Sequence, residues 1–238
     1  MFKRVLIREL KSIPRDRMYL FLVFYPFMMI GISLLLIPYL RSLNQDLASQ
    51  IVILVFILLM GFMYGAITGF TLLDDQDDNV LLSLRITPIS VRHYVLIKLL
   101  ICYLMSILFT FLLIVSTNVL PSISLTRFLM ILILAPMQGP LIAVLINCFA
   151  TNKVEGFVYM KLSGLLLMIP IASLFLTNWT ELGLGWIPGF WSARIISMEL
   201  LPLDYFLGYD WVYFLVGLIT HVVIFGLLFK LYMKRIIT

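Results

Sequence analysis

The chain has 238 residues, of which 63% are hydrophobic and 12% are charged, and its formal net charge is +5. A soluble domain of this length could not cover so much apolar surface with so few polar side chains, so the composition excludes a soluble globular protein. It indicates an all-α integral membrane protein, and we expect a single transmembrane domain over residues 1–238.

The first 17 residues place apolar side chains at roughly helical spacing, with basic side chains on the other faces. This pattern predicts an amphipathic helix over residues 1–17 that lies in the membrane interface. Pro14 then turns the chain into the bilayer. A solvated basic leader is the alternative interpretation.

Six stretches are apolar enough to cross a bilayer, which takes about 20 consecutive residues with few or no charges. One of them, Leu162–Leu176, is short and has to recruit residues 157–161, with the Lys161 ammonium reaching back to the interface. The other five predicted spans are uncharged: Met18–Leu40, Ile51–Leu73, Leu99–Leu120, Phe128–Ala150 and Trp211–Phe229.

Lys and Arg are distributed unevenly between the two sides of these spans. Fourteen fall on the side shared by the two termini, and the other side has Arg41, Arg127 and Arg194. Because cytoplasmic segments retain positive charge, we expect a multi-pass protein of the cell (plasma) membrane with both termini in the cytoplasm. The positive charge then contacts anionic lipid headgroups, and no nucleic-acid partner is predicted.

Residues 74–98 form the most polar connection. From Asp74 onward we expect the chain to be outside the membrane, with its carboxylates at the N-terminal end of a short amphipathic helix, where they complement the helix dipole. Ser90 is expected to cap the next helix, which starts at Val91. Because carboxylates match an anionic leaflet poorly, we expect this helix to contact a protein partner. It could instead lie on the bilayer or pack within the protein.

The predicted spans contain few polar groups. Those that could line a substrate path are Thr68, Gln138, Asn147 and His221. For His221, a neutral imidazole bonded to a neighbouring helix is the simpler interpretation. The second span also carries glycines four residues apart, which allow close helix approach either within the chain or between two subunits. They are Gly61, Gly65 and Gly69.

The connection DDQDDNVLLSLRITPISVRHYVLIK, residues 74–98, resembles the first cytoplasmic loop of ATP-binding cassette (ABC) type 2 permeases. In that family the loop carries a coupling helix that docks into a groove of an ATPase subunit. The resemblance extends over the whole chain: an interfacial helix, six spans, and an outer segment at 177–210 that carries short re-entrant helices in the family. The family often has Glu-Arg-Glu followed by Gly-Thr-Leu. This chain has Asp residues and Asn79-Val80 instead, which leaves the docking residues open.

The resemblance implies a permease subunit that pairs with an identical or homologous second subunit and with two separately encoded ATPases. ATP and Mg would be bound by the ATPases, with no cofactor, metal or catalytic site in this chain. The implied cargo is an amphiphilic or hydrophobic compound such as a drug, a peptide antibiotic or a lipid-linked molecule. An ATP-independent channel or carrier, an intramembrane enzyme and a sensor subunit are the alternatives. The implied ATPase-coupling residues are Asp74, Asp75, Asp77, Asp78, Leu81, Leu84, Arg85, Thr87 and Pro88.

Overall fold

A computed structural model describes residues 17–84, 90–120, 123–201 and 203–237, and these residues form helices and connections without a strand. Six helical segments in this part of the chain are long and apolar enough to cross a membrane, as predicted. The interfacial helix expected over residues 1–17 lies almost entirely outside the described residues. The spans are α2 (Arg17–Ser42), α3 (Asp46–Asp77), α5 (Val91–Thr117), α6 (Leu125–Leu134) with η2 (Ala135–Met137) and α7 (Gln138–Phe149), α8 (Lys153–Leu166) with η3 (Ile169–Leu174), and α11 (Asp210–Ile237).

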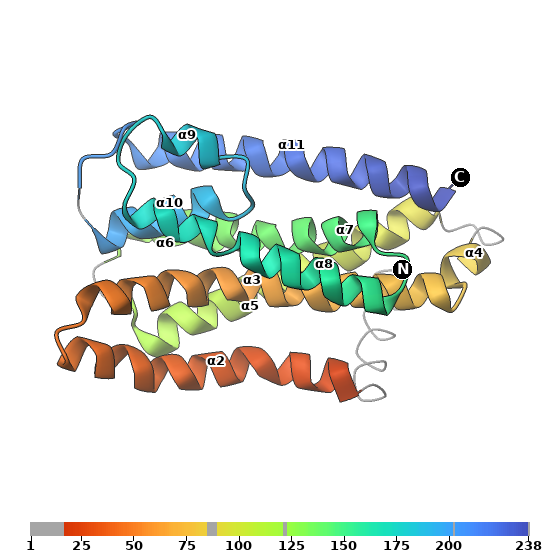
Figure 1. Ribbon diagram of the computed structural model, residues 1–238, viewed down its shortest axis with the longest axis horizontal. Helices are drawn as coiled ribbons and strands as arrows, with labels where there is room; N and C mark the ends of the chain where they lie inside the picture. Colours follow the sequence, from red (N-terminus) through yellow and green to blue (C-terminus); the bar gives the residue numbers. More distant parts are fainter. Residues whose placement is uncertain (1–16, 85–89, 121–122, 202, 238) are drawn as a thin grey trace.

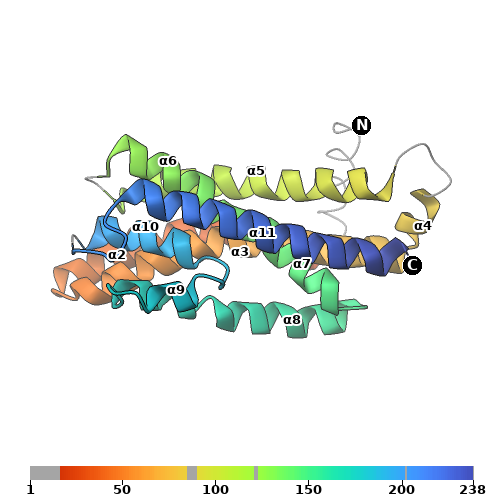
Figure 2. The same cartoon turned by 90° about the horizontal axis from the view of Figure 1, so that it is seen from above.

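The spans lie side by side in an elongated bundle (Figure 1). Among the described residues, three short helices lie outside the spans: α4 (Val80–Leu84) at one end, and α9 (Glu181–Leu184) and α10 (Phe190–Leu200) toward the opposite end. Seen from above, α5 and α6 lie on one side of the bundle and α8 and α9 on the other (Figure 2). Helix α3 contacts α7, α5 and α2 and is buried along most of its length, so it is the central helix.

The three spaced glycines of α3 face α7. A Cβ atom at Gly65 would lie 2.5 Å from the Gly139 carbonyl oxygen and 2.9 Å from the Ile142 Cβ. A Cβ at Gly61 would lie 2.9 Å from the Ala135 carbonyl oxygen, and one at Gly69 would lie 3.1 Å from the Ile146 Cδ1 of α7, a less crowded position. The glycines therefore serve close packing within the chain, which was one of the two roles that their spacing allowed.

Helix α3 continues past Leu73, where the second span was predicted to end, and stops at Asp77. With 32 residues it is about 48 Å long, more than the roughly 30 Å of a bilayer core. Asp74 and Asp75 therefore lie in the last turn of α3, and the prediction that they begin the next helix is wrong. Asn79, with φ at +56°, reverses the chain into α4. The predicted Ser90 cap and Val91 start of α5 are confirmed.

We expect Gly65→Ala to lower the thermal unfolding temperature of the detergent-solubilised protein. The new methyl group would press on backbone that belongs to a packed helix, and such overpacking costs about 1–3 kcal/mol. Gly226→Ala is the matched control, because nothing lies within 4 Å of a Cβ at that position and alanine is the better helix former. Equal unfolding temperatures for the two variants would contradict the tight contact between α3 and α7.

Candidate functional site

The short helix α4 turns its apolar side toward the protein. Leu81 is only 6% exposed and packs in a buried cluster with Tyr94 and Val95 of α5, and Leu84 lies at the edge of that cluster. The expectation that Leu81 faces a partner is therefore wrong, and packing within the protein holds for this residue. Burying the Leu81 side chain between α4 and α5 removes its apolar surface from water.

The carboxylates before α4 divide into two pairs. Asp77 and Asp78 are exposed, whereas Asp74 forms an ion pair with Lys153, Oδ1 to Nζ 2.7 Å. Asp75 is buried, and its Oδ2 lies 2.5 Å from Lys98 Nζ. This division follows from the continuation of α3, whose last turn directs Asp75 toward α5. Half of the predicted acidic surface is therefore used to hold the bundle together.

The buried Asp75 carboxylate also accepts a hydrogen bond from the Tyr94 hydroxyl, at 2.9 Å. Lys98 Nζ donates a second bond to the Thr71 carbonyl oxygen, at 3.3 Å. Both partners of the ion pair are thus hydrogen-bonded further, which is the condition for a buried pair to be tolerated. The pair joins α3 to α5 directly beside α4.

A neighbouring polar network joins the same end of α3 to α7 and α11. Gln76 Nε2 donates to Asn147 Oδ1 at 2.9 Å and to the Tyr232 hydroxyl at 3.2 Å. Asn147 Nδ2 in turn donates to the Gly69 carbonyl oxygen at 2.9 Å. Arg235 Nη1 donates to the Asn147 carbonyl oxygen at 3.1 Å and so satisfies an orphan acceptor at the end of α7. The side-chain amide of Asn147, a candidate for the substrate path, is therefore used in hydrogen bonds between helices.

The four candidate path residues do not gather in one place. Gln138 is buried against α3, where its Nε2 donates to the Leu58 carbonyl oxygen at 2.5 Å. Thr68 is half-buried on α3. His221 of α11 lines a cavity between α5, α11 and the α6–α7 junction. The sequence could not distinguish these environments, because all four are polar residues inside apolar spans.

The opposite end of the bundle holds a second buried ion pair. Arg194 of α10 and Glu181 of α9 are both fully buried, with Nη2 and Oε2 2.5 Å apart. Arg194 also donates to the Ser173 carbonyl oxygen at 2.6 Å, and the Tyr213 hydroxyl donates to Glu181 Oε1 at 2.6 Å. These bonds connect η3, α9, α10 and α11. Sequence reasoning counted Arg194 as a loop charge. The signal it missed is that Glu181 and Arg194 are the two charged residues of residues 162–198, which are otherwise uncharged.

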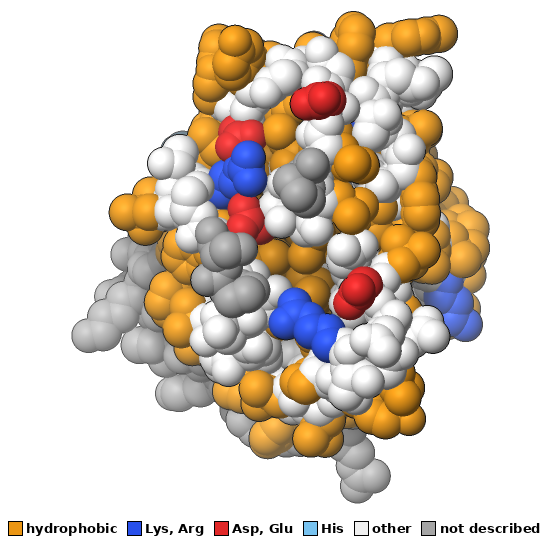
Figure 3. All heavy atoms as spheres, turned by 90° about the vertical axis from the view of Figure 1, so that its left-hand side faces the viewer, with side chains coloured by type: hydrophobic (Ala, Val, Ile, Leu, Met, Phe, Trp, Pro, Cys, Tyr) orange, Lys and Arg blue, Asp and Glu red, His pale blue; other side chains and the backbone are white. Residues whose placement is uncertain are grey.

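Further contacts surround the Glu181–Arg194 pair and stabilise this end of the bundle. The Arg194 guanidinium carbon lies 4.7 Å from the centre of the Tyr205 ring, within the range of a cation–π contact. Burial raises the pKa of the Tyr205 phenol, so its hydroxyl stays protonated and donates to the Leu201 carbonyl oxygen at 2.7 Å. Arg127 bridges Asp210 and Glu199, and charged side chains of both signs lie close together on this end of the molecule (Figure 3).

Lys98→Met should destabilise the protein by about 3–5 kcal/mol, because it leaves the Asp75 carboxylate buried without its partner. Changing Asp75→Asn together with Lys98→Met should recover most of this loss, as read from the thermal unfolding temperature in detergent. Lys153→Met is the control, since that pair with Asp74 is partly exposed and is worth at most about 1 kcal/mol. A Lys153→Met loss as large as that of Lys98→Met would contradict this ranking of the two pairs.

Comparison with known families gives one match. A family model described as "Fluoroquinolones export permease protein Rv2686c-like" matches residues 9–229, which include all six spans for most of their length. No curated protein and no solved structure matches the chain. An export permease is a multi-pass membrane transport protein, in agreement with the six apolar helical segments. The chain therefore belongs to the Rv2686c-like family of export permeases, which are ABC transporter permeases of type 2, as residues 74–98 had indicated.

Proposed function

We propose that this chain is the permease subunit of an ABC exporter that moves an amphiphilic or hydrophobic compound outward across the cell membrane. The energy comes from ATP hydrolysed, with Mg, by two separate ATPase subunits, and a second permease subunit completes the pathway. The observation that carries this proposal is the family match over residues 9–229. The family's description names fluoroquinolones, which are amphiphilic drugs, so a fluoroquinolone is the first cargo to test.

The arrangement of α4 supports a role in receiving a push from an ATPase. Helix α4 follows the central helix α3 after the reversal at Asn79, and Leu81 anchors it against α5. The Asp75–Lys98 pair fixes α3 to α5 at the same level. A force on α4 would therefore move the adjacent ends of α3 and α5 together. This is what a coupling helix has to do.

We place the ATPase contact on the exposed side of this end. Asp77, Asp78 and Ser83 are exposed, and Leu84 is partly exposed. Arg85, Thr87 and Pro88 lie outside the described residues and remain proposed contacts by family resemblance. Asp74 and Asp75 contribute indirectly, because they set the position of α4 through Lys153 and Lys98.

Asp77→Lys combined with Asp78→Lys should weaken co-purification with the cognate ATPase by about tenfold or more, since reversing two charges at an interface replaces attraction by repulsion. ATP-driven uptake of a fluoroquinolone into inverted vesicles should fall in parallel, with an unchanged unfolding temperature. Asp204→Lys, an exposed position in the connection before α11, is the matched control and should leave both readouts intact. Undiminished ATPase binding by the double variant would remove Asp77 and Asp78 from the docking surface.

The proposed orientation predicts which introduced cysteines react with a membrane-impermeant maleimide applied to intact cells. Asn178→Cys should be labelled from outside and Asp78→Cys should not, because Lys and Arg concentrate on the α4 side. Both positions are exposed, so both should react after permeabilisation. The parent chain is the control, since Cys102 is buried and Cys148 partly buried. The reverse pattern would place α4 and both termini outside.

A further inference from the structure

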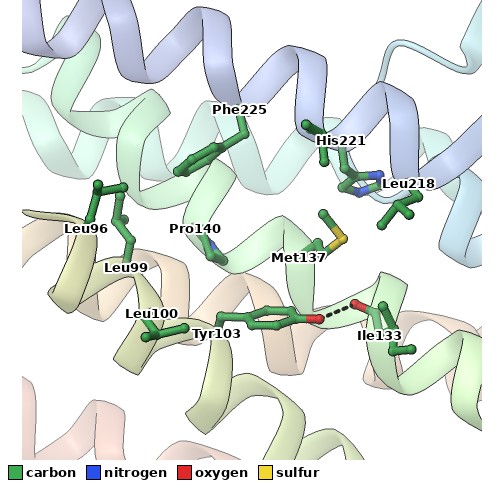
Figure 4. A pocket seen from close by; sticks show the side chains of 11 residues that line it. Leu96, Leu99, Leu100, Tyr103, Ile133, Met137, Pro140, Leu218, His221 and Phe225 are labelled. Atoms are coloured by element: carbon green, nitrogen blue, oxygen red, sulfur yellow. Dashed lines mark hydrogen bonds between the residues drawn. The ribbon is translucent and has the colours of Figure 1, made fainter.

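An apolar cavity of about 380 Å³ lies between α5, α11 and the junction of α6, η2 and α7. Figure 4 shows the side chains that line it, which come from α5, α11 and the α6–α7 junction. The polar groups among them are the Tyr103 hydroxyl and the His221 ring. Its apolar lining includes Leu99, Met137, Pro140 and Phe225.

One wall of the cavity is an interrupted membrane helix. Between α6 and α7 the chain makes one 3-10 turn that contains Pro136, and Pro140 follows within the first turn of α7. Each proline removes a backbone donor, so a regular hydrogen-bond ladder cannot continue here. The Tyr103 hydroxyl donates to the Ile133 carbonyl oxygen at 3.0 Å, as Figure 4 shows. Interrupted helices are tolerated in a membrane where they line a cavity, and such breaks commonly form the binding sites of transporters.

His221 places beside the cavity a hydrogen-bond acceptor that is shielded in this conformation and lacks a donor. Its Nδ1 lies 2.8 Å from the Gly217 carbonyl oxygen. Because a carbonyl can only accept, Nδ1 carries the proton, and Nε2 of the neutral ring is an acceptor. The residue is 3% exposed, and Nε2 has no partner among the described residues. A buried acceptor left unpaired is unfavourable, so a bound molecule with a donor at this position would be stabilised.

The mouth of the cavity lies on an apolar surface. Leu100, Ile133 and Val222 line the cavity and are each at least 40% exposed. Since the three belong to membrane-spanning segments, the mouth opens toward hydrocarbon and a ligand would enter from the bilayer. Met137 lies in the same wall, and its unbranched side chain can change rotamer to admit a donor to Nε2.

We propose that this cavity binds a lipid-soluble small molecule that carries an O–H or N–H donor. The donor bonds His221 Nε2, and the apolar body packs against Leu99, Pro140 and Phe225. An acyl chain of a phospholipid would fill the same space without offering a donor. The inference goes beyond the proposed export function, because binding requires neither ATP nor a partner subunit.

The test uses a 4-alkylphenol with a diazirine on its chain, and the O-methyl ether of the same compound, with the purified chain in phospholipid nanodiscs. The phenol should give saturable crosslinks to cavity residues of α5 and α11, mapped by mass spectrometry. Methylation removes the donor and should reduce this labelling by about tenfold, the effect of one buried hydrogen bond. His221→Phe, which keeps a ring of similar size, should reduce phenol labelling equally and leave ether labelling unchanged.

Two further variants complete the design. Val223→Phe changes an exposed neighbour on α11 that does not line the cavity, and it should label as the parent chain does. Leu100→Trp narrows the mouth and should reduce labelling by both probes. Equal labelling by phenol and ether would overturn the proposal, because the cavity would then accept any apolar chain. Crosslinks outside the cavity would also overturn it. Should His221→Phe fail to fold, the comparison of the two probes on the parent chain decides.

Discussion

The close approach of α3 to α7 is the contact on which the rest of the bundle depends. Glycines on both helices let the two backbones approach closely: a Cβ atom added at Gly65 would lie only 2.5 Å from the Gly139 carbonyl oxygen. Only at this separation can Gln138 and Asn147 of α7 reach carbonyl oxygens of α3, at Leu58 and Gly69. In hydrocarbon, where apolar contact alone gives little preference for protein over lipid, packing and such hydrogen bonds hold helices together. The other spans assemble around this pair.

Ionisable groups inside the described part of the chain concentrate near the two ends of the bundle. Asp75 and Lys98 form a buried pair beside α4, and Glu181 and Arg194 form another near the opposite end. Each pair also forms hydrogen bonds to groups on neighbouring elements, so each acts as a fixed joint between helices. Groups of this kind that are paired and packed are poor carriers of protons or ions. This agrees with the proposal that another subunit supplies the driving energy.

The sequence was sufficient to predict those elements that are determined by residues close together in the chain. Apolar stretches predicted the six spans, and Ser90 before Val91 predicted the start of α5, because hydropathy and capping act within a few residues. The sequence was insufficient where a residue's position depends on a partner far away in the chain. Asp75 stays in α3 because Lys98, on the next span, neutralises it, and no local pattern reports that pairing. Leu81 was taken for a surface residue for the same reason, since Tyr94 and Val95 cover it.

The candidate site shows the same division. The glycine spacing indicated a close helix contact and left its partner open, which only the packing against α7 identifies. Gln138, Asn147 and His221 were grouped by polarity, yet their surroundings differ: Gln138 and Asn147 bond to carbonyl oxygens of α3, whereas the His221 ring bonds to a carbonyl oxygen of its own helix. The prolines of the α6–α7 break are visible in the sequence. The cavity beside them depends on the positions of α5 and α11 in the bundle, and these positions cannot be predicted from the spacing of residues in the sequence.

The Glu181–Arg194 pair has a consequence for how the chain is made. Either residue alone would oppose entry of its segment into the bilayer, but the two lie close together in the sequence and neutralise each other when α9 folds against α10. Ser173, which accepts from Arg194, has already been synthesised by then, whereas Tyr213 comes later on α11. These two charges can therefore neutralise each other before α11 is made, and the Tyr213 hydroxyl of the last span then adds its hydrogen bond to Glu181.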